Sequence, residues 1–333
     1  MVQKRISEIL LFTLLFLNAC GGNKFEVDTS KIDVRLDIKR LDKDLIANYP
    51  DSVDVYGLIN KYGNFLELYS KFIIQAGAPS NKDFAKSIMD FNKYCSDFQI
   101  PEEVDKVFGD LNELKSNLTV AFKHYKYYFP DKQIPEIYTY LSNFNQSVVV
   151  DEGLLGIGLD KYLGVDRELY PTGTDWYKIR RMHKAMIPVD CMRLIAESDY
   201  PFKDSVNNML NQMVYQGKIQ YFLDAMLPAV PDTLKFGYTK DQLDWADYNE
   251  HKMWAYLVEH KMLFITNELE IKKMIGDAPF TSLFANNSAP RAGAFLGWKI
   301  VSRFMAKHPD ISLSELMKND DYQGILNAAA YKP

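Results

Sequence analysis

A group of titratable side chains near position 250 is the first candidate for acid–base chemistry. Asp247 and His251 lie four residues apart, so a helix would place them on one face, where a carboxylate can orient an imidazole for proton transfer. Asp244 and Glu250 belong to the same stretch. The alternative is a solvated helix face, opposite the aromatic residues Trp245, Tyr248 and Trp254. We favour the solvated face, which is the usual place of closely spaced charges on an amphipathic helix.

The histidines and cysteines form no local zinc motif. Zinc sites usually draw on paired histidines or paired cysteines. None of the histidines lies four residues from another; they are His124, His183, His251, His260 and His308. The sequence also lacks a G-x-S-x-G elbow, a phosphate-binding P-loop and a dinucleotide fingerprint. We therefore expect no cofactor and no metal, although a metal site assembled from distant residues stays open.

The first twenty residues carry an export signal that ends at a cysteine. Lys4 and Arg5 precede a short apolar run, which ends in Leu17-Asn18-Ala19-Cys20. The run is too short to span a bilayer, and its basic flank is typical of a signal peptide. Leu17 and Ala19 before the cysteine resemble the bacterial lipobox, which implies removal of residues 1–19 and acylation of Cys20. An ordinary secretory signal with an incidental cysteine is the alternative.

The composition is that of a packed globular protein. The chain carries 39 Lys and Arg against 44 Asp and Glu, which gives no electrostatic reason for nucleic acid to bind. A hydrophobic content of 47% and an aromatic content of 14% allow a large core. Cys95 and Cys191 are the other cysteines, and we expect two buried thiols; a disulfide between them is the alternative.

Hydrophobic periodicity predicts helices on both sides of a small sheet. Residues 31–41 alternate between apolar and charged side chains, which predicts a half-buried strand. Helical spacing follows from Asp42 to about Tyr128 and predicts three or four helices. Three β-branched or aromatic runs between turn residues then predict strands, at 137–141, 147–150 and 154–159.

Helical spacing returns after Pro188. The predicted helices cover 188–199, 203–227, 239–266, 291–306 and 312–318. Ser312 and Glu315 have the spacing of a capping box at the start of the last helix. We therefore predict an α+β fold, mainly helical with a small β-sheet, in one domain over residues 31–333 behind a lipidated tether at 20–30.

Short motifs along nearly the whole mature chain follow the order of a known family. Besides the lipobox they are Arg40-Leu41-Asp42, Gly158-Leu159-Asp160-Lys161-Tyr162-Leu163-Gly164, Gln216-Gly217-Lys218-Ile219-Gln220-Tyr221, Gly237-Tyr238-Thr239, Asn249-Glu250, Pro290-Arg291 with Gly297-Trp298, and Tyr331-Lys332-Pro333. Together they resemble the gliding-motility lipoprotein GldB family. The resemblance implies a bacterial cell-envelope lipoprotein linked to gliding machinery and to the type IX secretion apparatus, with no established enzymatic activity.

A second resemblance concerns the helix that begins near Pro188. Zincin-like peptidases carry H-E-x-x-H on one helix and a glutamate ligand on a later helix. If the segments correspond, Val189 and Arg193 occupy the histidine positions, Asp190 the general base and Gln216 the third ligand. Valine has no lone pair and a guanidinium is cationic, so neither can hold Zn²⁺. The resemblance implies an inactive zincin-like scaffold with an Arg193–Asp190 or Arg193–Gln216 contact; a plain amphipathic core helix is the alternative.

These observations favour a non-catalytic envelope protein over an enzyme. We expect it to be held at the outer membrane by the lipid on Cys20, to face the periplasm and to bind envelope proteins, with no small-molecule substrate. One expected sign is an aromatic cleft, although spacing places most of its candidates in the core: Tyr138, Tyr140, Tyr221 and Trp254. The alternatives are a zincin-like or other hydrolase that uses His183, His251 or His260, and a glycan-binding module with exposed tryptophans.

Overall fold

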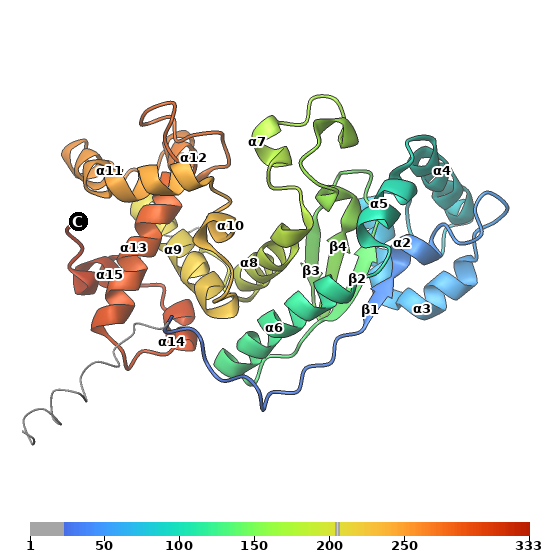
Figure 1. Cartoon of the computed structure of the whole chain (residues 1–333), viewed down its shortest axis with the longest axis horizontal. Coiled ribbons are helices and arrows are strands. Elements are labelled where there is room, and N and C mark those ends of the chain that lie inside the picture. The colour runs from blue at the N-terminus through green and yellow to red at the C-terminus, as the bar shows by residue number, and fades with distance from the viewer. Residues whose placement is uncertain (1–22, 204, 206) are drawn as a thin grey trace, which may run out of the picture.

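The computed structural model describes residues 23–203, 205 and 207–333 (Figure 1). The expected signal peptide and Cys20 lie outside the described residues. The described part of the expected tether packs along the domain, because the Asn23 side chain donates to the Pro228 carbonyl at 2.9 Å and the Phe25 ring meets the Tyr221 ring edge-on. Within the described residues, every helix is too short or too polar to cross a membrane.

A four-stranded mixed sheet lies between layers of helices (Figure 1). Its order is β1 (Ile38–Arg40), β2 (Glu136–Tyr140), β4 (Leu154–Gly158) and β3 (Val148–Asp151). β1 and β4 run parallel to β2, and β3 pairs antiparallel with β4. The predicted strands in the middle of the chain are confirmed.

The predicted strand over residues 31–41 is wrong except for β1. Val34 and Leu36 are buried, as the alternation predicted, but their backbone pairs with no strand among the described residues. Alternation of apolar and charged residues predicts which side chains are buried, whereas a β-strand also requires backbone hydrogen bonds to a neighbouring strand. The β1–β2 ladder joins only Ile38–Arg40 to Ile137–Thr139, so the chain before it stays extended without a ladder.

Helices between β1 and β2 in the chain cover both faces of the sheet. They are α2 (Leu41–Asp44), α3 (Val55–Leu68) with the π-helical turn η2 (Tyr69–Ile73), α4 (Phe84–Asp97), α5 (Ile100–Phe108) and α6 (Asn112–Tyr128). The helical character of this half is confirmed, with more helices than predicted. Residues of α3 and α4 pack on Tyr138 and Tyr140 from β2, while α6 packs on the opposite face through Ile137.

Helices after the sheet form the other half of the molecule. They are α7 (Trp176–Ile179), α8 (Ile187–Asp199), α9 (Met209–Met226), α10 (Asp232–Phe236), α11 (Lys240–Glu259), α12 (Glu268–Ile275), α13 (Ala292–Lys307), α14 (Leu313–Lys318) and α15 (Tyr322–Ala329). Single 3₁₀ turns stand before α8: η3 (Leu159–Tyr162), η4 (Arg167–Leu169) and η5 (Lys184–Met186). The helices expected after Pro188 and the Ser312–Glu315 capping box are confirmed, whereas α10, α12 and α15 were missed.

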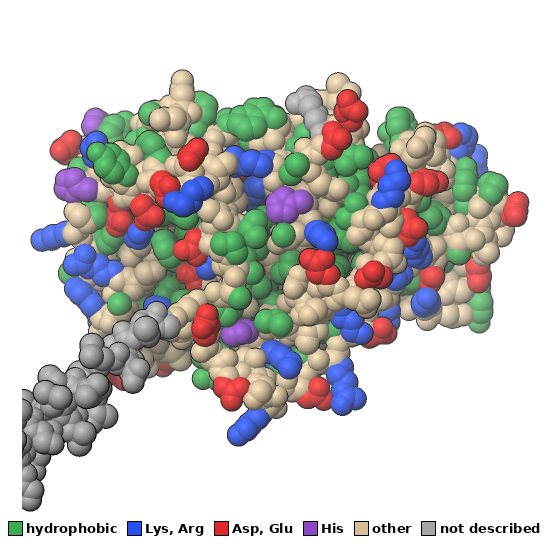
Figure 2. Space-filling view, in the orientation of Figure 1, with side chains coloured by type: hydrophobic (Ala, Val, Ile, Leu, Met, Phe, Trp, Pro, Cys, Tyr) green, Lys and Arg blue, Asp and Glu red, His purple; other side chains and the backbone are tan. Residues whose placement is uncertain are grey.

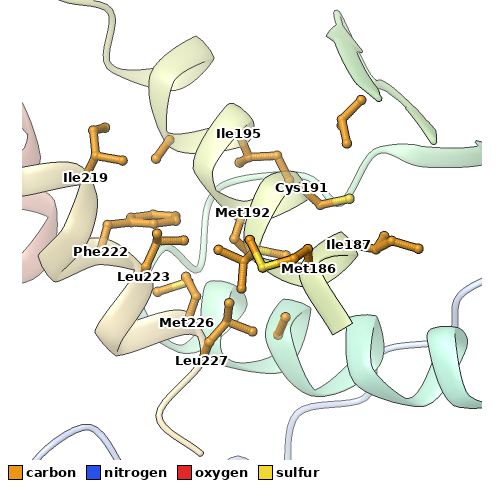
Figure 3. Packing of buried hydrophobic residues seen from close by; sticks show 14 of the residues in the cluster. Met186, Ile187, Cys191, Met192, Ile195, Ile219, Phe222, Leu223, Met226 and Leu227 are labelled. Atoms are coloured by element: carbon orange, nitrogen blue, oxygen red, sulfur yellow. The ribbon is translucent and has the colours of Figure 1, made fainter. Parts of the chain in front are cut away.

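Helix α9 is the central helix of this half. It is buried along most of its length and on all sides, the pattern of a helix inside a protein core. Figure 3 shows Met192 of α8 and Leu223 and Met226 of α9 directed toward one another. On its other side α9 crosses α13 where Gly217 and Gly297 meet, so two backbones approach with no side chain between them.

The two cysteines in the described part are free and buried, as expected. Cys95 lies on α4 and Cys191 on α8. Burial raises the pKa of the Cys95 thiol to about 12, so this side chain behaves as a small hydrophobic group.

Candidate functional site

A cluster of charged side chains surrounds the first turns of α8. Pro188 opens the helix, and Asp190 follows in its first turn, where the helix dipole favours a carboxylate. The Tyr162 hydroxyl, carried by η3, donates to Asp190 Oδ2 at 2.8 Å. Burial raises the pKa of Asp190, and the positive charge of Arg181 is the strongest influence that opposes this shift. Asp190 is thus a partly buried carboxylate held by a phenol and faced by arginines.

Arg193 lies one turn further along α8. Its Nη2 donates to Gln220 Oε1 at 3.3 Å and to the Lys235 carbonyl at 3.0 Å. The predicted contact with Gln216 is wrong: the partner is one turn later on α9. Asp190 affects Arg193 by charge alone, because the described residues include no hydrogen bond or ion pair between the two. Val189 is 1% exposed and packs in the hydrophobic core.

Two further arginines approach the same place from other elements. Arg181, which follows α7, reaches Asp277 with Nη1 at 3.3 Å from Oδ1. Arg291 precedes α13 and donates from Nη2 to the Phe236 carbonyl. Burial, together with the charges of Arg181 and Arg193, lowers the pKa of Arg291 to about 9. We call Arg181, Arg193 and Arg291 the arginine cluster.

Gly237 makes room for this cluster. It ends α10 in the left-handed conformation, with φ +64, which suits glycine. A Cβ there would stand 2.6 Å from Nε of Arg181, so a larger residue would displace the guanidinium. The next residue, Tyr238, donates its hydroxyl to the Pro290 carbonyl at 2.6 Å and so ties the α10 turn to the start of α13.

The arginine cluster is short of acceptors. In the described part of the chain, Nε of Arg181, Arg193 and Arg291 is buried and has no hydrogen-bond partner. Gln220 Nε2 is likewise buried and has no hydrogen-bond partner among the described residues. Buried N–H groups of this kind are rare in folded proteins and costly when unpaired.

A small pocket opens beside the cluster. Its volume is about 140 Å³, and its walls include Lys161 and Tyr162 from η3, Lys178 and Arg181 from the α7 segment, and Asp190 from α8. Figure 2 shows Lys and Arg side chains gathered between the α7 segment and the α10–α12 region. A second hollow of about 490 Å³ is mainly apolar and lies between residues 26–27, α6 and the loop after α9.

The acid–base candidates on α11 lie elsewhere. Asp247 pairs with Lys299 at 2.7 Å, and His251 Nδ1 lies 2.8 Å from the Pro333 carbonyl oxygen, both at the surface. The solvated-face interpretation is confirmed for Asp247 and His251, but Tyr248, which was expected on the opposite side, is itself 80% exposed. Among the residues that the structure describes, no three His, Cys, Asp or Glu side chains are placed to hold a metal. Tyr138, Tyr140 and Tyr221 are core residues, as their spacing indicated.

Sequence reasoning missed most of the arginine cluster. The motifs that carry the family resemblance include several of its members and partners, but nothing in their spacing shows that they meet; these are Tyr162, Gln220, Gly237 and Arg291. Arg181 has no local signal apart from its arginine neighbour. Gln220 and Gln216 are four residues apart on one helix face, so the sequence could not decide between them.

Fold and site together define a mainly helical α+β protein with a partly buried cluster of arginines and a carboxylate. The family model of gliding motility protein GldB matches residues 22–333. The chain therefore belongs to the gliding motility protein GldB family, a family of lipoprotein type. Comparison with curated proteins and with solved structures gives no significant match.

Proposed function

We propose that this protein is a non-catalytic, lipid-anchored protein of the cell envelope that acts through contacts with other envelope proteins. In this proposal Cys20 carries the lipid, and the domain faces the periplasm from the outer membrane. Membership of the GldB family supports the envelope and gliding-motility setting.

The non-catalytic proposal depends on the side chains that stand at the two zinc-ligand positions of α8. If α8 corresponds to a zincin helix, Arg193 stands where a metal-binding histidine would be, and two hydrogen bonds to Gln220 and Lys235 hold it there. Val189, at the other histidine position, is packed in the core. Neither side chain can donate a lone pair to Zn²⁺.

Contacts with partner proteins are supported by the surface. The rings of Tyr94 and Phe98 lie 4.6 Å apart and are 44% and 62% exposed. They border a hollow of about 240 Å³ that Phe144 and Tyr170 also line. Exposed aromatic groups beside a hollow are typical of protein interaction sites.

We expect the purified protein to retain no zinc after incubation with equimolar Zn²⁺ and removal of unbound ions. Metal content by mass spectrometry measures this. The matched control is the double variant Val189→His/Arg193→His, which places two imidazoles four residues apart and should gain zinc if α8 is zincin-like. Circular dichroism checks that the variant keeps its helices. Stoichiometric zinc in the unaltered protein would overturn the non-catalytic proposal.

Replacing Cys20 with serine should release the protein from the membrane. The thioether-linked lipid would then have no attachment point, whereas several acyl chains on one residue hold a protein firmly. Fractionation of cells and incorporation of labelled palmitate measure the effect. Cys95→Ala is the control, because Cys95 lies buried in the domain and should leave both readouts unchanged. A Cys20→Ser protein that still sediments with membranes contradicts the anchor.

A further inference from the structure

The arginine cluster has more hydrogen-bond donors than the protein supplies acceptors. Arg291 donates a single hydrogen bond among the described residues, to the Phe236 carbonyl, and Arg181 makes one contact, with Asp277. The Nε–H groups of both, and that of Arg193, are buried and unpaired. A guanidinium presents its donors in a planar fork that fits two oxygens of one carboxylate or phosphate group.

The neighbouring acids do not neutralise the cluster directly. Asp190 and Glu197 lie close enough for their charges to act on Arg193, but the described ion pairs within 4.0 Å include neither acid. Asp190 instead accepts the Tyr162 hydroxyl. Asp277 is the acid that pairs with the cluster, through Arg181. Of the three arginines, Arg181 is the one that lines the pocket beside the cluster, so an anion there would meet this guanidinium, whose present partner is Asp277.

The pocket beside the cluster has the size and the walls for a small anion. Its volume of about 140 Å³ compares with ~30 Å³ for a water molecule in the liquid, so it holds a group of roughly four or five heavy atoms. Lys161 and Lys178 line it together with Arg181, and the positive end of the α8 dipole lies at Asp190. Asp190 and Asp277 also line it, and Asp277 pairs with Arg181, so an anion seated on Arg181 and the lysines takes the place of Asp277 on that guanidinium.

We propose that this pocket binds a small oxyanion, either a phosphate or a carboxylate group, through Arg181 with Lys161 and Lys178. The anion supplies an acceptor to Arg181, the member of the arginine cluster that lines the pocket. This proposal rests on the proposed non-catalytic function in one respect: it treats the region around α8 as a site that binds a ligand and does not catalyse a reaction. Binding of the anion requires no metal.

The test is titration of the full-length protein in detergent with inorganic phosphate and, separately, with sodium acetate at constant ionic strength. Binding is followed by isothermal calorimetry and by the thermal unfolding midpoint. We expect saturable binding of at least one of the two anions, and the one that binds identifies the chemical class. Arg181→Gln should weaken binding at least tenfold. Arg303→Gln removes the same charge from an exposed site on α13 and should leave binding unchanged.

Two results would overturn the oxyanion site. One is the absence of saturable binding for both anions, and the other is an equal response of Arg181→Gln and Arg303→Gln, which would indicate general screening. Lys178→Gln is a second pocket variant in case Arg181→Gln does not fold. Failure here leaves the zinc result untouched, so the oxyanion site and the non-catalytic proposal can fail independently.

Discussion

Replacing Gly297 with alanine is expected to lower the free energy of unfolding by about 3 kcal/mol, the upper part of the range for overpacking a core. A Cβ at Gly297 would overlap the backbone carbonyl of Met213 on α9. The opposing glycine has the same problem, because a Cβ on Gly217 would overlap the backbone of Gly297. Backbone atoms cannot rotate away as a flexible side chain can, so α9 and α13 would have to move apart.

Denaturant unfolding, followed by circular dichroism, measures this effect. Gly153→Ala is the matched control: a Cβ there meets nothing within 4 Å, but the residue has φ +70, so alanine costs only the strain of the left-handed conformation, about 1 kcal/mol. Equal losses for Gly297→Ala and Gly153→Ala would show that α9 and α13 do not need the close approach. The crossing also positions two arginines of the cluster, because Arg193 donates to Gln220 of α9 and Arg291 directly precedes α13.

Replacing Lys235 with methionine should cost about 3 kcal/mol, because loss of one partner leaves a buried charge uncompensated. Lys235 Nζ lies 2.5 Å from Asp224 Oδ1, and the two side chains are 5% and 8% exposed. Trp298 Nε1 donates to the other oxygen of Asp224 at 2.7 Å. The carbonyl of Lys235 also accepts from Arg193, so this ion pair stands next to the arginine cluster.

The double variant Asp224→Asn/Lys235→Met separates the pair from its surroundings. It removes both charges and should recover part of the loss, since a buried ion pair and a neutral replacement are often similar in stability. The free energies of unfolding of Asp224→Asn, Lys235→Met and the double variant together give the interaction energy between the two side chains. Additive losses would show that the two charges do not depend on each other.

The loss in Lys235→Met should also depend on pH. Burial raises the pKa of Asp224, and Lys235 is the largest influence that lowers it, so removing the lysine raises this pKa further. A group whose pKa is raised on folding stabilises the protein most below its unfolded pKa, and that contribution is lost as the pH rises through the folded pKa. The destabilisation by Lys235→Met should therefore be smaller at pH 4 than at pH 7.

The elements with strong local signals were predictable. The helices at α8, α11 and α13 follow apolar spacing, α9 is a long and mainly apolar segment, and Ser312 with Glu315 forms the capping box that their spacing indicated. Residues 31–37 show the limit of such signals, because burial of Val34 and Leu36 produces alternation without any strand partner. Short helices such as α10 and α15 hold too few residues to show a period, and contacts with larger elements support them.

Residue patterns predicted an export signal, which lies outside the described residues, most of the longer helices and the central strands, and the absence of histidine at the two α8 positions that correspond to a zincin motif. Each depends on residue types at short spacing, which a chain carries whatever its fold. Three features became visible in the folded protein alone: Arg181, Arg193 and Arg291 lie near one another, Arg193 donates to Gln220 and not to Gln216, and Asp190 accepts from Tyr162. These contacts join residues distant in the chain, and they depend on how α8 packs against α9 and η3, while the glycine contact at Gly217 and Gly297 sets how closely α9 and α13 approach.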